Sequence, residues 1–278
     1  MIALVLDVLT TASILFVVAS GLLLVFGVMK IINFAHGAVI TLGGYAALAC
    51  TGLGMNPWLG LPLGALVGGV AGVVVESLAV RPLYARPLDA ILATWGLGIV
   101  ISQVVTLCFG RGVHFARSPL TGTVNVLGTE YSLYRLSLVL VALALGGLLT
   151  LLLQGTRLGL ETRSVIMNED LARGLGINSG LVRFVTFSLG SALAGIAGMV
   201  IAPLSSIDPN MGVPWQVNAF MLVMVSGYSL LTLAVSCLVL GAAQVLISVY
   251  IDPILGGLTI TVLAAVILRI RPEGFARV

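Results

Sequence analysis

The chain has 278 residues, a net charge of +3 and a mean hydropathy of +1.19, and 59% of its residues are hydrophobic. Only 8% are charged, against about 25% in soluble domains, so the chain cannot present a soluble surface and is predicted to be a polytopic membrane protein. The small, scattered charge excludes a nucleic-acid footprint, and the three cysteines form no CxxC pair of the kind that holds a metal.

Apolar runs that approach or exceed the roughly 20 residues of a membrane span follow one another along the chain. The predicted membrane segments are 8–28, 37–51, 58–80, 90–110, 136–153, 183–203, 217–248 and 254–268. The run 217–248 is too long for one upright span and is interrupted at Ser226-Gly227, so we expect a half-length segment followed by a full one. The predicted fold class is all-α: one transmembrane domain, 1–278, with about eight membrane segments, some of them broken.

Basic residues orient the bundle, because loops rich in Lys and Arg remain in the cytoplasm. Two loops and the C-terminal tail are expected inside on this ground; they hold Arg81, Arg86, Arg157, Arg163, Arg173, Arg269, Arg271 and Arg277. The loops 52–57 and 204–216 contain no Lys or Arg and are expected outside, together with the N-terminus. The loop 111–135 is also expected outside, although it holds Arg111, Arg117 and Arg135.

Charge is concentrated in the stretch 157–183, which holds seven of the 23 charged residues (13 basic and 10 acidic). Met167, Leu171 and Leu175 recur every four residues, so a short helix here would carry one apolar stripe. Gly176 stands where a helix C-cap is expected. An amphipathic helix at the edge of a membrane is typical of a docking element. A solvated loop that only joins two spans is the alternative.

Small residues define two expected packing faces. Gly60, Gly64, Gly68 and Gly72 repeat every four residues along the third segment. In the segment 183–203, two pairs of small residues four positions apart make a second face: Ser191 with Gly195, and Ala194 with Gly198. Such faces let helix backbones approach closely, so we interpret them as sites of helix packing.

Polar groups at membrane depth are costly and are candidates for a translocation path. Those that we single out, with their aromatic neighbours, are Asn33, Phe34, His36, Thr94, Trp95, Gln103 and Asn218, and further candidates are Gln216 and Gln244. Asn33 and His36 suit either a broken helix lining a cavity or an interfacial turn, and Trp95 suits either the path or an interfacial aromatic belt. Glu76 is expected to reach the interface or to pair with Arg81.

No residue pattern indicates catalysis by this chain. The two histidines have no Ser, Cys or carboxylate spaced as a nucleophile or metal partner, so an intramembrane enzyme is disfavoured. No GxxxxGK[ST] motif is present, so energy-coupled work requires a separate ATPase subunit. The competing interpretation is a stand-alone channel or secondary transporter, with breaks at Asn33 and Gly227, but no carboxylate accompanies them to couple an ion.

Two stretches resemble a known family. The run GLLLVFGVMKIINFAHG (21–37), and NEDLARGLGIN followed by FSLGSALAGIAG within 163–198, are similar to the membrane permeases of branched-chain amino acid ABC importers. The similarity extends over nearly the whole chain to the tail RPEGF (271–275). Within the family, LATWG (92–96), the stretch 118–134 and the stretch 218–223 look closer to the urea and short-amide branch.

This resemblance implies a permease of the bacterial cytoplasmic (inner) membrane that translocates a small polar solute, urea or a short amide or a branched-chain amino acid. The implied partners are a second related permease (the same or a different chain), two cytoplasmic ATPases that bind ATP and Mg²⁺, an extracytoplasmic solute-binding protein and the lipid bilayer. This chain itself is expected to bind no cofactor. The family's Glu-Ala-Ala-type coupling loop maps onto this chain with Asp170 and Leu171 in place of Glu and the first Ala. The implied coupling loop spans about 157–182 and includes Met167, Glu169, Asp170, Leu171, Ala172, Arg173, Leu175 and Gly176.

Overall fold

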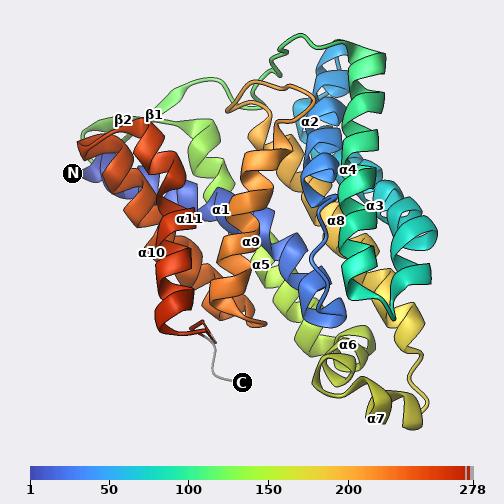
Figure 1. Cartoon of the computed structure of the whole chain (residues 1–278). Helices are drawn as coiled ribbons and strands as arrows, with labels where there is room; N and C mark the ends of the chain where they lie inside the picture. Colours follow the sequence, from blue (N-terminus) through green and yellow to red (C-terminus); the bar gives the residue numbers. More distant parts are fainter. Residues whose placement is uncertain (273, 276–278) are drawn as a thin grey trace.

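The computed structural model of the protein describes residues 1–272 and 274–275, so Arg277 of the basic tail lies outside the described residues. The described chain is a bundle of α-helices with one small β-hairpin (Figure 1). The helices are α1 (Ile2–Met29), α2 (His36–Gly52), α3 (Gly60–Val75), α4 (Pro87–Phe109), α5 (Leu133–Gly155), α6 (Arg157–Met167), α7 (Glu169–Gly174), α8 (Ser179–Ile201), α9 (Gly212–Ser226), α10 (Leu230–Tyr250) and α11 (Pro253–Ile270). Short turns η1 (Pro57–Leu59), η2 (Glu76–Val80) and η3 (Arg81–Leu83) flank α3.

Seven helices of the described residues are long and apolar enough to cross a membrane: α1, α3 with its flanking turns, α4, α5, α8, α10 and α11. The prediction of an all-α polytopic bundle is confirmed. Two further segments are shorter, α2 with 17 residues and α9 with 15. The predicted break at Ser226-Gly227 separates α9 from α10, and Gly227 takes a positive φ of 68° there. A residue with a side chain is strained at such a φ, so the glycine permits the break.

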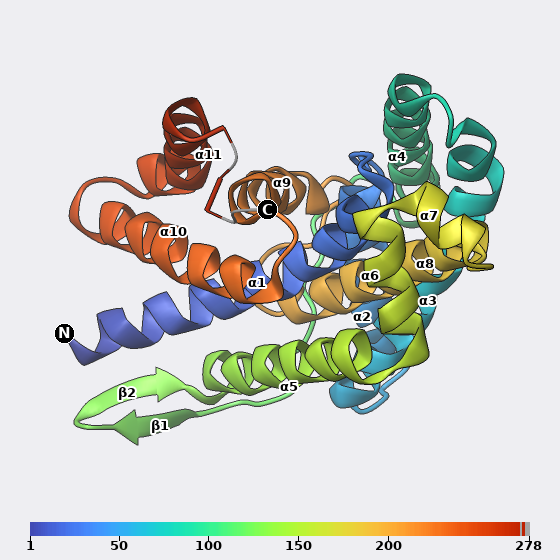
Figure 2. The same cartoon turned by 90° about the horizontal axis from the view of Figure 1, so that it is seen from below.

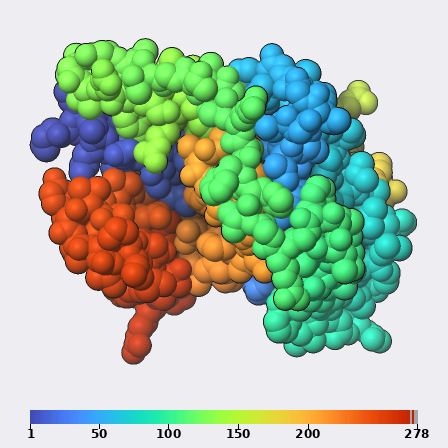
Figure 3. Space-filling model, turned by 90° about the horizontal axis from the view of Figure 1, so that it is seen from above, coloured from blue at the N-terminus to red at the C-terminus, as the bar shows by residue number. Residues whose placement is uncertain are grey.

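Helices α1 and α8 form the centre of the bundle. Both bury most of their length, whereas α4 and α5 turn most of theirs outward, where a bilayer would surround them. Seen from above, α4 lies at the edge of the molecule (Figure 3). Leu15 and Leu22 of α1 pack in one core with Ala194 of α8 and Leu240 of α10. Seen from below, α1 passes between α5 and α10 (Figure 2). Helix α1 is therefore a central helix of the bundle and does not lie at its periphery.

The glycine face of α3 lies against α8. Gly60, Gly64, Gly68 and Gly72 are all buried there. A Cβ atom on Gly68 would overlap the carbonyl oxygen of Ser191 and lie 2.9 Å from Cα of Gly195, and one on Gly64 would lie 2.8 Å from the Gly195 oxygen. The two backbones touch, so no larger residue fits without moving a helix.

A β-hairpin in the loop between α4 and α5 escaped the sequence interpretation. Strand β1 (Thr123–Val126) pairs antiparallel with β2 (Thr129–Ser132). Its turn residues Leu127 and Gly128 both have positive φ (51° and 86°), as tight hairpin turns require. The Leu-Gly pair lacks the Asn or Asp that usually marks such a turn.

The hairpin is tied to the start of α1 through Asp7. The hydroxyl of Tyr131 donates to Asp7 Oδ1 at 2.8 Å, and Arg135 Nη1 forms an ion pair with the same oxygen at 2.9 Å. Asp7 therefore partly neutralises one of the three arginines that made the loop 111–135 exceptional in the charge pattern.

The arrangement of the ends follows the charge pattern. Helices α6 and α7, the connection from α3 to α4 and the end of α11 lie at the lower end of the bundle in Figure 1. The connections from α4 to the hairpin and from α8 to α9 lie at the upper end. The basic regions expected inside thus share one end of the molecule.

Candidate functional site

The charged loop folds into two short helices, so the prediction of one continuous helix through Met167, Leu171 and Leu175 is wrong. The break is at Asn168, whose backbone is extended (φ −157°). Its Oδ1 accepts the N–H of Leu171 at 3.0 Å and thereby caps α7. An Asn side chain that satisfies the next helix's free N–H groups favours starting a new helix over continuing the old one.

The end of α7 is fixed by Gly176. The N–H of Gly176 donates to the carbonyl of Arg173, and the N–H of Ile177 donates to that of Ala172, both at 3.0 Å. This is a Schellman motif, whose C′ residue requires a left-handed backbone, and Gly176 has φ +87°. Asn178 then caps α8 through the N–H of Leu181 at 3.1 Å.

The docking face, defined as Met167, Leu171 and Leu175, is exposed although it is apolar. The exposed fractions of these residues are 87%, 62% and 74%. Leu171 lies in α7, Leu175 is the C-cap residue of α7 four positions further on, and Met167 is the last residue of α6. Ala172 is buried instead, in a small cluster with Val28, Val165 and Val182. The loop therefore holds large apolar side chains outward from an anchored base.

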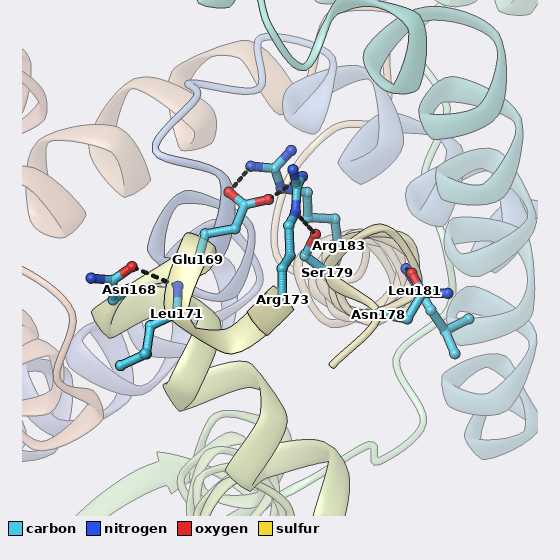
Figure 4. Close-up of polar contacts among 8 residues, drawn as sticks. All are labelled: Asn168, Glu169, Leu171, Arg173, Asn178, Ser179, Leu181 and Arg183. Carbon is cyan, nitrogen blue, oxygen red and sulfur yellow. Dashed lines mark hydrogen bonds and ion pairs between the residues drawn. The ribbon is translucent and has the colours of Figure 1, made fainter. Parts of the chain in front are cut away.

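Charged side chains fasten α7 to α8. Glu169 accepts from Arg173 Nη2 at 2.7 Å and from Arg183 Nη2, while Arg173 Nε donates to Ser179 Oγ at 2.7 Å (Figure 4). The Arg183 side chain is only 14% exposed and that of Glu169 24%, so solvent weakens their pairing less than that of a surface pair. Asp170, the other acidic residue of α7, is exposed.

A cavity of about 410 Å³ brings together several of the predicted path residues. Its lining comes from α2, α4, α9 and their connections: Phe34, Ala38, Trp95, Gly98, Ile99, Ser102, Gln103, Asn210, Val213, Gln216 and Val217. None of these residues is charged. Polar amides and a hydroxyl among apolar and aromatic walls are the composition of a site for a small polar molecule. Trp95, Gly98 and Ser102 recur at helical spacing along one face of α4. Once Trp95 is singled out, this spacing would have predicted Ser102 as a further lining residue.

A non-helical segment between α1 and α2 shapes this cavity. Asn33 is 2% exposed, and its Oδ1 accepts the N–H of Ala35 at 3.0 Å. The N–H of Phe34 donates to Thr94 Oγ1 at 3.2 Å, and the N–H of Gly37 donates to Gln216 Oε1 at 2.8 Å. Side chains of α4 and α9 thus satisfy backbone groups that the broken helix leaves free. Asn33 is thus buried in a broken segment rather than at an exposed interfacial turn, but it is not among the residues that line the cavity.

Other predicted path residues lie elsewhere. His36 is buried, with Nε2 3.1 Å from the carbonyl oxygen of Val18, and does not line the cavity. Asn218 is half-buried on α9 and is not among the lining residues. Thr94 is not among the lining residues either, but its Oγ1 accepts the N–H of Phe34, which is one of them. Gln216, a further candidate from the sequence, is in the lining, whereas Gln244 is not. Asn210 is also in the lining; it precedes a helix in an irregular connection and has no sequence signal.

Glu76 differs from its expectation. It neither reaches the surface nor pairs with Arg81, because it is fully buried in η2 and accepts a hydrogen bond from the Tyr84 hydroxyl.

A larger groove of about 830 Å³ lies on the side of the bundle between α1, α5 and α10. Its mainly apolar walls suit hydrocarbon better than a polar solute, so the smaller cavity is the better candidate path.

Comparison with known proteins adds the family. The family described as "Branched-chain amino acid transport system / permease component" matches residues 4–268. The chain belongs to this family. It is 26% identical over 275 residues to the high-affinity branched-chain amino acid transport system permease protein LivH of Salmonella typhimurium, covering 92% of this chain and 89% of that one. With the seven membrane-length helices, this makes the protein a multi-pass permease of the inner membrane.

Other similarities are broader. BraD of Pseudomonas aeruginosa, named for the same transport system, is 29% identical over 235 residues (79% of this chain, 76% of that one). The ribose import permease protein RbsC of Escherichia coli K12 is 27% identical over 229 residues (81% and 69%). The structure entitled "PsaBC from Streptococcus pneumoniae in complex with Fab" superposes with a TM-score of 0.52 at 14% identity, over 96% of this chain and 91% of that one, and shows a common fold.

Proposed function

We propose that this permease is the transmembrane subunit of an ATP-driven importer and that α7 couples it to separate ATPase subunits. The observation that carries the proposal is the docking face: three large apolar side chains, on the capped and ion-paired helix α7 and at its two ends, are exposed at the basic end of the bundle. Exposed apolar groups on an anchored base are typical of a surface that inserts into a partner. A second, related permease and an extracytoplasmic solute-binding protein complete the assembly.

The solute is proposed to be small, polar and without net charge, and to pass the cavity between α2, α4 and α9. Branched-chain amino acids are the first candidates, because the family and the LivH and BraD relatives carry that name. Urea or a short amide is the second. The observation that favours it is the lining, which offers the amides of Gln103, Asn210 and Gln216 but no charged group for a carboxylate or ammonium.

The test is uptake into vesicles that contain the full set of subunits, with labelled leucine and labelled urea offered in parallel. Uptake of leucine that requires ATP and the binding protein supports the first candidate, and uptake of urea under the same requirement supports the second. Uptake of either solute by vesicles that hold this permease without ATPase subunits would instead identify a stand-alone channel or secondary transporter, and would overturn the proposal.

A further inference from the structure

Arg183 joins three parts of the molecule that are distant in sequence. It lies in the first turns of α8, donates to Glu169 of α7, and its guanidinium carbon lies 4.6 Å above the centre of the Tyr84 ring. Tyr84 directly follows η3, at the inner end of the third span. A largely buried guanidinium over an aromatic ring gains a cation–π attraction that water does not screen.

The series continues into the bundle through Tyr84. Its hydroxyl donates to Glu76 Oε1, and Ser77 Oγ lies 3.4 Å from the other oxygen of that carboxylate. Glu76 is fully buried, and a buried carboxylate is costly unless it is hydrogen-bonded. Burial and the bond to Glu76 raise the pKa of the Tyr84 hydroxyl, so it keeps its proton for donation throughout the physiological range. Glu76 begins the π-helical turn η2, a widened turn of a kind often found at functional sites.

Few other contacts hold α7 to the bundle. Its buried residue is Ala172, in a cluster of small aliphatic side chains, and its larger apolar residues point outward. Two polar contacts give α7 a directional link to α8, the pairing of Glu169 with Arg183 and the bond from Arg173 Nε to Ser179 Oγ at 2.7 Å. Of the two residues of α8, Arg183 is the one that also contacts Tyr84. Interactions between charged groups in a partly buried place depend steeply on geometry, which is what a link that transmits displacement requires.

We infer that Arg183 is a positioning residue for coupling, which passes displacement of α7 through Tyr84 to the inner end of the third span as well as directly to α8. This inference rests on the proposed function, since it assumes that α7 receives the ATPase. Glu169, Arg183, Tyr84 and Glu76, in that order, form the coupling relay. Arg183 is too buried to contact the ATPase substantially, so its effect on transport runs through its neighbours.

The experiment compares variants in the reconstituted importer and measures solute taken up per ATP hydrolysed, basal ATPase rate and recovery of the ATPase with the permease. For Glu169→Gln and Arg183→Gln we expect uptake per ATP to fall about tenfold, within the usual 5- to 150-fold range of coupling between sites. For Arg183→Gln, recovery of the ATPase and its basal rate should stay within about twofold of wild type, because the pair of Arg173 with Glu169 remains and the docking face is unchanged. The double variant should be no worse than the worse single one, since residues that act as a unit are not additive.

Two further variants separate a relay from a structural role. Arg183→Lys keeps the charge but loses the planar stacking on Tyr84, so it should still lower uptake per ATP, by a smaller factor. If Arg183→Gln reduces the yield of folded protein, Arg183→Lys is the variant that tests the relay. The matched control is Arg163→Gln on α6, because Arg163 forms no ion pair among the described residues and should couple normally.

Normal uptake per ATP in both Arg183 variants overturns the relay while leaving the importer intact. Failure of the wild-type assembly to show any ATP-dependent uptake is a different result: it overturns the proposed function, and the relay falls with it. Loss of ATPase recovery in Arg183→Lys would assign Arg183 to assembly instead of coupling and would also refute the inference.

Discussion

The contact between α3 and α8 makes a sharp prediction for two adjacent glycines. A Cβ atom on Gly68 would overlap the Ser191 carbonyl oxygen and lie 2.9 Å from Cα of Gly195, and both obstacles are backbone atoms that cannot rotate away. A Cβ atom on Gly69 would meet only the Cβ of Ala192 at 3.7 Å, an ordinary contact. Gly68→Ala should therefore push the two helices apart, whereas Gly69→Ala should fit.

The magnitude follows from two terms. Both substitutions gain about 0.5–1 kcal/mol, because alanine loses less entropy than glycine in a helix interior. Only Gly68→Ala carries an overpacking cost, about 1–3 kcal/mol. Since the first term is common to both, the free energies of unfolding of the two variants should differ by about 1–3 kcal/mol, with Gly69→Ala at or above wild type.

The assay is reversible unfolding of the purified permease in mixed micelles, followed by circular dichroism, with the two variants and wild type measured side by side. Equal stability of Gly68→Ala and Gly69→Ala would refute the reasoning, because it would mean that α3 and α8 do not approach as closely as the glycine contacts indicate. A loss in both variants would point to a requirement for flexibility rather than to the contact.

Further predictions concern the two candidate sites. Leu171→Gln should lower recovery of the ATPase with the permease at least about tenfold, as loss of a buried interface anchor does, while Leu160→Gln, with a similar exposed fraction on α6, should not. Gly176→Ala should destabilise the end of α7 by about 1–2 kcal/mol through its positive φ and raise the rate of proteolysis there; Gly174→Ala, with open space around its Cβ, should not. Gln216→Leu removes the acceptor for the Gly37 N–H and a cavity amide, so we expect a raised KM for uptake with ATPase recovery unchanged. Asp7→Ala removes the partner of Tyr131 and Arg135 and should speed cleavage of the hairpin turn at Leu127 without altering the ATPase rate.

The membrane segments and their packing faces could be predicted from the sequence, because hydropathy and glycine spacing are read within short stretches of the chain. It also placed the break before α10, where a glycine interrupts an apolar run, and it named Phe34, Trp95 and Gln103 of the cavity. It missed the separation of α6 from α7, because apolar spacing of four residues looks the same whether or not Asn168 caps a new helix. The prediction for Glu76 was wrong for another reason. Glu76 meets its partner Tyr84 across an unusual π-helical turn, and no residue pattern predicts such a turn.

Contacts of α8 indicate how a docking loop at one end could act on a cavity within the bundle. Near its start, α8 carries Arg183, which holds α7. Further along, Gly195 leaves no room for a side chain against α3, because a Cβ there would lie 2.9 Å from the carbonyl carbon of Gly64. Gly198 leaves none against α2, because a Cβ there would lie 2.7 Å from the N atom of Gly44. Helix α2 in turn brings Ala38 to the cavity. Backbones packed without intervening side chains cannot slide or tilt independently, so α2, α3 and α8 should move as one body. The start of α9 is tied to α2 in the same way, because a Cβ on Gly212 would lie 2.8 Å from the carbonyl carbon of Gly37. In the proposed importer, displacement of α7 would then shift the α2 wall of the cavity against α4.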